Sequence, residues 1–238
     1  GLTLIAPMAH AQDAVTGFSQ SLELDLVSDY VFRGVSNSDE TAAVQPSYTA
    51  NWTTHAGAVW SLGIWASTLD QDAAIDHEVD WWGGVTWSNG LGDFSAAFTW
   101  YSYPGSPKDT GASFGEAQMT AGHALGPVYL TGEYDYSNDY YGLAGPSHYV
   151  NANLATGEDV LPGGLVLSGH VGHQWFDDNA AYGSPDYTDG GLRLERSFSW
   201  LKAGLEWTTT DLDSAECFGG LAICGDRVFV TLAASVAP

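Results

Sequence analysis

A two-residue alternation of apolar and polar side chains constrains this chain more than any other feature, and it runs from residue 18 almost to the end. Leu22, Leu24 and Leu26, for example, alternate with polar or acidic residues. Successive side chains of a strand point to opposite faces, so the pattern predicts strands with one apolar and one polar face. Each predicted strand has roughly ten residues, the length of a tilted strand that crosses a membrane. The predicted strands are 18–27, 43–53, 58–67, 76–88, 93–103, 113–125, 127–136, 147–155, 164–175, 187–197, 200–210 and 227–236.

The connections between these segments alternate in length. The short connections include Asn89-Gly90 and Gly126-Pro127, which are typical of hairpin turns. Short turns on one rim and long loops on the other are the layout of outer-membrane barrels. The sequence therefore predicts an all-β fold, a transmembrane antiparallel up-and-down barrel of about 12 strands with short periplasmic turns and long extracellular loops. The short connections are 54–57, 89–92, 126–127, 155–163 and 198–199, and the long ones are 28–42, 68–75, 104–112, 137–146, 176–186 and 211–226.

A soluble β-sandwich or a lipocalin-like barrel is the alternative, with its apolar face inside and its polar face in water. Here the apolar faces carry Trp and Phe near strand ends, as in the aromatic girdles of membrane barrels. The polar faces carry Gly, Ser, Thr, Asn and charged residues, which suit a wet lumen. Twelve strands also enclose more space than side chains fill, since about eight strands are already just filled. The membrane barrel is favoured.

The composition excludes several classes of protein. The chain has 29 Asp plus Glu against 6 Lys plus Arg, and a net charge of −23 that would repel nucleic acid. Its 45% hydrophobic and 13% aromatic residues argue against an acidic disordered chain. No apolar run reaches the length of about 18 residues that a membrane helix needs. The expected partners are membrane lipid and small solutes, and the expected location is a bacterial outer membrane.

The first residues predict export. Residues 1–11 are apolar and end in Ala9-His10-Ala11, which is typical of the cleavage site of a secretory signal peptide. We expect 1–11 to be the remnant of that peptide and 12–238 to be the barrel domain. In an oxidising compartment Cys217 and Cys224 should pair as a disulfide. A metal site is less favoured, because no His or further Cys lies near them in the sequence.

The alternation also assigns candidate pore-lining residues. If Leu22, Leu24 and Leu26 face lipid, the residues between them face the lumen. Asp29 and Arg33 are then expected on one strand face near the loop rim, where they could pair with each other or with neighbours. Such pairs would form either a structural ion-pair network that fixes the barrel wall or a constriction charge that selects solutes. Acidic candidates outnumber basic ones eleven to three in this set, which predicts a preference for cations. The candidates are Glu23, Asp25, Asp29, Arg33, Glu78, Asp80, Glu116, Glu133, Asp135, Asp189, Arg193, Glu195, Lys202 and Glu206.

The sequence predicts neither an enzyme nor a bound cofactor or metal. Common motifs of hydrolases, zinc proteases and phosphate-binding loops are absent. A hydrolase with Ser, His and Asp on different strands is an open alternative, since that class leaves no local motif. The loop carboxylates lack the spacing of an EF-hand, so solvated loop charge is favoured over Ca²⁺ binding. These carboxylates are Asp70, Asp72, Asp76, Asp177, Asp178, Asp186, Asp211, Asp213, Glu216 and Asp226.

Several segments resemble one known family. Residues 28–39, Ser-Asp-Tyr-Val-Phe-Arg-Gly-Val-Ser-Asn-Ser-Asp, are similar to the opening signature of the TorF porin family of proteobacteria. The cysteine pair before the final strand is similar too. The resemblance covers nearly the whole of 12–238 and implies a Gram-negative outer-membrane barrel that passes small solutes. Further similar segments are 78–81, 100–105, 133–136 and 181–188.

Two functions are compatible with this fold. The first is a porin-like channel for passive diffusion of small hydrophilic solutes, with a preference for cations. The second is a structural or surface-binding barrel whose lumen is plugged. Loop 28–42, or loop 137–146 with its Tyr and Gly residues, could fold inwards and close the pore.

Overall fold

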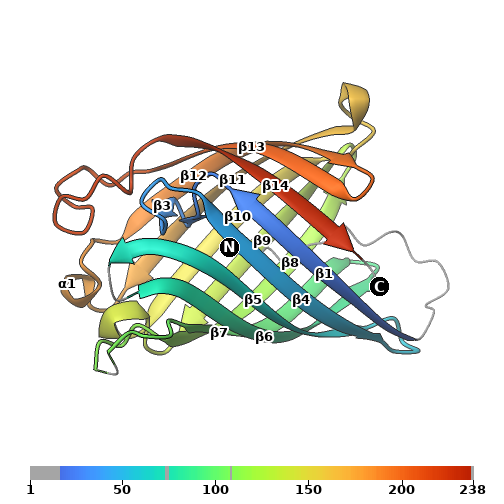
Figure 1. Cartoon of the computed structure of the whole chain (residues 1–238). Coiled ribbons are helices and arrows are strands. Elements are labelled where there is room, and N and C mark those ends of the chain that lie inside the picture. The colour runs from blue at the N-terminus through green and yellow to red at the C-terminus, as the bar shows by residue number, and fades with distance from the viewer. Residues whose placement is uncertain (1–16, 73–74, 108, 237–238) are drawn as a thin grey trace.

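The chain closes into an antiparallel barrel of twelve strands, as the alternation predicts (Figure 1). The computed structural model describes residues 17–72, 75–107 and 109–236. The predicted signal remnant at 1–11 lies outside these residues. Neighbouring strands pair in sequence order, and β1 closes the barrel by pairing with both β4 and β14. The wall strands are β1 (Gly17–Val27), β4 (Ala43–Thr53), β5 (Val59–Asp72), β6 (Ile75–Asn89), β7 (Gly92–Ser102), β8 (Phe114–Leu125), β9 (Val128–Ser137), β10 (Ser147–Thr156), β11 (Leu165–Phe176), β12 (Tyr187–Phe198), β13 (Leu201–Thr210) and β14 (Arg227–Val236).

The other elements are short. β2 (Val31–Phe32) and β3 (Val35–Ser36) form a separate two-stranded hairpin between β1 and β4. Two 3₁₀ turns, η1 (Tyr141–Leu143) and η2 (Pro162–Gly164), and one helical turn, α1 (Asn179–Tyr182), lie in connections. In the part of the chain that the structure describes, no helix is both long enough and apolar enough to cross a membrane.

The exterior of the barrel is apolar. Leu22 and Trp81 are 52% and 57% exposed, whereas the acidic Glu78 and Asp80 beside Trp81 point inwards and are buried. The strand register keeps this division around the barrel, because residues paired across neighbouring strands share a face. Such an exterior needs lipid around it, and a closed barrel leaves no unpaired strand edge in the bilayer. The fold and its surface place the protein in a bacterial outer membrane.

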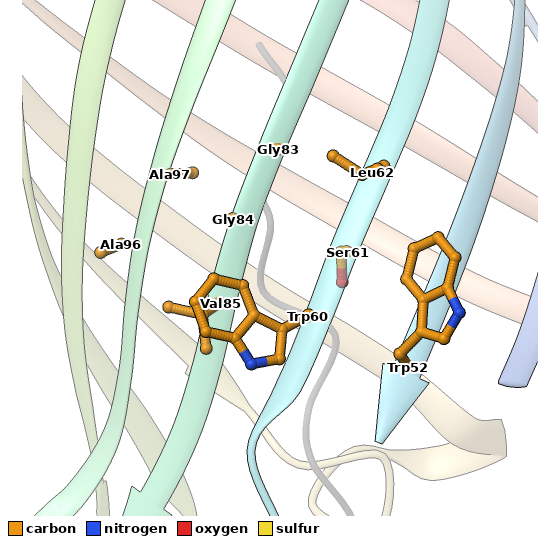
Figure 2. A pocket seen from close by; sticks show the side chains of 9 residues that line it. All are labelled: Trp52, Trp60, Ser61, Leu62, Gly83, Gly84, Val85, Ala96 and Ala97. Carbon is orange, nitrogen blue, oxygen red and sulfur yellow. The ribbon is translucent and has the colours of Figure 1, made fainter. Parts of the chain in front are cut away.

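Figure 2 shows a shallow hollow in this exterior. Its lining crosses four neighbouring strands, with Trp52 on β4, Trp60 and Leu62 on β5, Gly83 on β6 and Ala96 on β7. A Cβ added at Gly83 would lie 2.8 Å from a methyl carbon of Leu62, so the hollow depends on glycine there. Its outward-facing lining is apolar, as the lipid-facing wall requires.

Apart from the connection between β5 and β6, short and long connections lie on opposite rims, as predicted. Residues 54–58, 90–91, 126–127, 157–164 and 199–200 join strands at one rim, and the longer connections lie at the other. In outer-membrane barrels the short-turn rim is periplasmic and the long-loop rim is extracellular. The predicted loop 68–75 is wrong, because β5 continues to Asp72 and β6 begins at Ile75. The acidic residues Asp70 and Asp72 favour a loop in the sequence, but a strand that projects beyond the membrane can carry charge on both faces.

The closed ladder predicts a heat-modifiable protein. Every wall strand is hydrogen-bonded on both sides, so detergent alone should leave the barrel folded. We expect an unboiled sample to migrate differently from a boiled one on a detergent gel. Identical migration of the two samples, or a chain that stays monomeric and soluble without detergent, would contradict the membrane barrel.

Candidate functional site

The lumen has two unlike halves. Towards the short-turn rim its wall carries accessible charged groups, with the side chains of Lys202 and Arg193 48% and 35% exposed. Towards the long-loop rim the lumen is filled by a cluster of buried side chains, many of them aromatic. Among the residues that the structure describes, this cluster closes the extracellular end, and the accessible part of the lumen towards the periplasmic rim is called the open half below. The main aromatic members of the cluster are Tyr30, Tyr101, Tyr103, Phe114, Tyr140, Phe176 and Tyr187.

The β2–β3 hairpin is the centre of this closure. Its two turn residues, Arg33 and Gly34, have φ of 47° and 80°, as a two-residue hairpin turn requires. A Cβ on Gly34 would lie 2.5 Å from Thr210 Cγ2 and 3.0 Å from Asp189 Cβ, so the turn sits directly against the wall at β12 and β13. Positive φ is unfavourable for Arg33 by about 1–2 kcal/mol. Contacts of its side chain must offset that strain.

The Arg33 side chain is held in a cage of acceptors on the barrel wall. One guanidinium nitrogen, Nη1, donates to Glu116 Oε1 at 3.0 Å and to Gln174 Oε1 at 2.7 Å. The other, Nη2, donates to Glu116 Oε2 at 3.1 Å and to Asp135 Oδ2 at 2.7 Å. Tyr140 Oη lies 3.5 Å from Nη1. Asp135 is on β9, six strands from β1 in either direction, so the hairpin and its arginine reach the opposite side of the barrel.

Aromatic rings complete the cage. Arg33 Cζ lies 4.1 Å from the ring centroid of Tyr149 and 4.7 Å from that of Phe32. The Arg33 and Glu116 side chains are 5% and 1% exposed, so water screens the pair little. Burial by itself lowers the pKa of the guanidinium, but Glu116, Tyr140, Asp135 and Tyr101 together outweigh it, and the pKa is raised well above its ordinary value. Arg33 is therefore charged, and it forms ion pairs with two buried carboxylates, Glu116 and Asp135.

A second set of bonds fixes the base of the hairpin. The Asp29 carboxylate accepts hydrogen bonds from the hydroxyls of Ser36 and Ser38 and forms an ion pair with Arg227 at 3.4 Å. The prediction that Asp29 and Arg33 share a strand face is wrong, and of the two predicted pairings the structure has the one with neighbouring residues, not the one between Asp29 and Arg33. β1 ends at Val27, so both residues lie on the segment that leaves the wall, and they form ion pairs with different residues.

Further contacts tie the hairpin to the wall at β5 and β6. Tyr30 Oη donates to Glu78 Oε2 at 3.1 Å, and Tyr103 Oη donates to the other oxygen of Glu78 at 3.0 Å. Burial, and then the charge of Glu78, raise the pKa of both phenols well above its ordinary value, so both remain protonated donors. The Tyr30 ring also packs edge-on against Trp65 at 5.4 Å between centroids.

Two extracellular loops cover the hairpin from outside. In 138–146, Tyr140 and Ala144 are buried in the same cluster. In 211–226, Cys217 and Cys224 form the predicted disulfide, and both are buried. The carbonyl of Ile223, beside this bond, accepts a hydrogen bond from the amide of Ser36 on β3. The sequence predicts that loop 28–42 or loop 137–146 could close the pore. Both loops contribute to the closure. Among the described residues, no group of three or more His, Cys, Asp or Glu side chains is arranged to hold a metal ion.

The structure separates the predicted lumen residues into two groups. All those on wall strands lie on the face opposite the exposed apolar side chains and so point inwards. Sequence reasoning missed Gln174, Tyr149 and Arg227, whose inward positions follow from the same alternation. The group at the closed end is Glu78, Asp80, Glu116, Asp135 and Asp189. The group in the open half is Glu23, Asp25, Glu133, Arg193, Glu195, Lys202 and Glu206.

Arg193 and Lys202 are already engaged in the open half. Arg193 forms ion pairs with Glu195 at 2.7 Å and with Glu206 at 3.3 Å, and Lys202 pairs with Glu195 at 3.3 Å. These pairs lie on neighbouring strands β12 and β13. Elsewhere in this half Glu133 accepts a hydrogen bond from Asn151, a neutral partner.

Comparison with known families gives one match, which covers residues 11–236. It is the family described as "Bacterial protein of unknown function (Gcw_chp)". The chain belongs to this family. No curated protein matches the sequence significantly. The range of this Gcw_chp protein that matches the family includes the hairpin and the cage that holds Arg33.

Solved structures with the same fold are outer-membrane channels of very different sequence. An outer membrane channel from Pseudomonas putida F1 is 10% identical with a TM-score of 0.56, covering 97% of this chain and 100% of that one. The NanC porin is 10% identical with a TM-score of 0.57, covering 90% of this chain and 98% of that one. The KdgM porin, solved in complex with disordered oligogalacturonate, is 6% identical with a TM-score of 0.53, covering 92% and 99%. At these identities the likeness establishes the barrel fold.

Proposed function

We propose that this Gcw_chp protein is an outer-membrane, porin-like channel for passive diffusion of small hydrophilic solutes, closed at its extracellular end by the β2–β3 hairpin. The observation that carries the proposal is the solvent-accessible, charged half of the lumen that ends at this hairpin. The hairpin is not part of the wall ladder, and its backbone bond from Ser36 goes to Ile223 in the 211–226 loop, so it can withdraw without breaking the barrel. Residues 28–39, which resemble the TorF porin family, contain the hairpin itself.

A preference for cations is part of the proposal. Of the predicted lumen residues, the open half carries five acidic side chains, Glu23, Asp25, Glu133, Glu195 and Glu206, against Arg193 and Lys202. Both basic residues are paired with Glu195 or Glu206, so Glu23, Asp25 and Glu133 dominate the remaining field. Low-dielectric walls focus such a field and concentrate cations at the mouth.

Reversal potentials in planar bilayers test the cation preference. Under a KCl gradient we expect a cation-selective potential that weakens at high salt, since screening acts over about 8 Å at physiological ionic strength. Glu23→Gln combined with Glu133→Gln should reduce the selectivity. The control is Glu158→Gln, an exposed residue in the β10–β11 turn. An anion-selective potential at low salt would contradict the proposal.

A structural barrel with a permanently plugged lumen is the second candidate. The extent of the buried aromatic cluster favours it, together with the disulfide loop bonded to β3. The two candidates differ in whether the hairpin can withdraw. A barrel that never conducts, even when the hairpin's anchors are removed, would support the structural role.

A further inference from the structure

We infer that the cage around Arg33 is a binding site for guanidinium-bearing solutes, with Arg33 as its resident occupant. This inference rests on the proposed channel function, because a solute can reach the cage only when the hairpin withdraws. The cage holds a guanidinium group with a planar two-point contact to Glu116, further acceptors on Asp135 and Gln174, and an aromatic face on Tyr149.

The geometry favours guanidinium over ammonium. Both oxygens of Glu116 receive hydrogen bonds from different nitrogens of the same group, at 3.0 and 3.1 Å. A compact ammonium cannot make this parallel pair of bonds, and it stacks less well on the Tyr149 ring. A guanidinium also presents enough donors to reach Gln174 and Asp135 at the same time.

Most of the cage belongs to the wall and not to the hairpin. Glu116, Asp135, Tyr149 and Gln174 lie on β8, β9, β10 and β11, which are consecutive around the barrel. Phe32 is the one cage ring that would leave with the hairpin. In addition, the Asp135 side chain is only 1% exposed, and its Oδ1 has no hydrogen-bond partner. The wall therefore keeps a built site with an unused acceptor after Arg33 is withdrawn.

Arg33 competes strongly with any free solute, because it is tethered to the site. Tethered groups act at effective concentrations in the millimolar range or above. A free guanidinium compound should therefore bind the wild-type protein weakly and the Arg33→Ala protein well. Arg33 would act in this way as an internal competitor that leaves only when the hairpin moves.

The test is calorimetric titration of the refolded Arg33→Ala barrel in detergent with methylguanidinium chloride and, separately, methylammonium chloride. Methylguanidinium carries the end of an arginine side chain. We expect it to bind at least tenfold more tightly than methylammonium, and we expect Glu116→Gln in the same background to remove the difference. Equal affinities, or a difference that survives Glu116→Gln, would overturn the inference.

Two further readouts separate possible failures. If Arg33→Ala folds poorly, methylguanidinium in the refolding buffer should raise the fraction of heat-modifiable protein, and no increase would count against the cage. In bilayers, an Arg33→Ala channel that conducts but is affected equally by both cations would overturn the cage and leave the channel intact. A protein that binds methylguanidinium selectively but never conducts would retain the site and refute the proposed function.

Discussion

Replacing Arg33 with Ala is expected to raise the open fraction of the channel roughly a hundredfold or more. The substitution leaves Glu116 and Asp135 buried and without their cation, and removing one partner of a buried ion pair costs about 3–5 kcal/mol. When the hairpin withdraws, water can reach both carboxylates and relieve that cost. Each 1.4 kcal/mol changes the equilibrium between the docked and the withdrawn hairpin tenfold, so the docked state loses most of its stability relative to the withdrawn state. Single-channel recording in planar bilayers measures the open fraction directly.

The matched control is Arg196→Ala. Arg196 lies on the outward face of β12, where its Cζ is 4.8 Å from the centroid of the Phe198 ring. Its loss removes the same charge from the protein without touching the lumen, so we expect unchanged conductance. Arg33→Lys should fall between wild type and Arg33→Ala, because it keeps the charge and loses the two-point contact with Glu116. An Arg33→Ala channel as closed as wild type would show that other contacts hold the hairpin.

The wall of this barrel could be predicted from the sequence because one rule governs it. A wall strand has lipid on one face and lumen on the other, so alternation fixes both its existence and the side on which each residue lies. Glu116, Asp135 and Arg193 were assigned to the lumen in this way, and the register places them there. The disulfide followed from two nearby cysteines in an exported chain.

The closure of the lumen could not be predicted, because alternation says nothing once the chain leaves the wall. Val27 is the last residue of β1, so the rule placed Asp29 and Arg33 on a strand that does not exist. The turn that directs Arg33 across the barrel is Arg-Gly, which lacks the Asn-Gly or Asp-Gly signal of most two-residue hairpins. Its partners on β8, β9 and β11 are 83 to 141 residues away in the sequence. Only the closed barrel brings them together.

Gly34→Val is expected to open the same channel by a steric route. A valine side chain at φ 80° is strained by about 1–2 kcal/mol, and forcing extra carbon into a packed site costs about 1–3 kcal/mol more. The first added carbon would already lie 2.5 Å from Thr210 Cγ2 and 3.1 Å from the carbonyl oxygen of Thr209. The wall is held by its ladder, so the hairpin must move. We expect a large rise in open fraction, with the heat-modifiable band on a gel unchanged.

Gly164→Val separates the clash from the strain. Gly164 also has positive φ, at 72°, but no atom would lie within 4 Å of its added Cβ, and it sits in the β10–β11 connection at the other rim. We expect that variant to lose a little stability and to conduct like wild type. Gly34→Val added to Arg33→Ala should change the conductance little, because the hairpin has already withdrawn. A further large increase in the conductance of the double variant would mean that the two substitutions open different paths. The hairpin would then not be the single element that closes the channel.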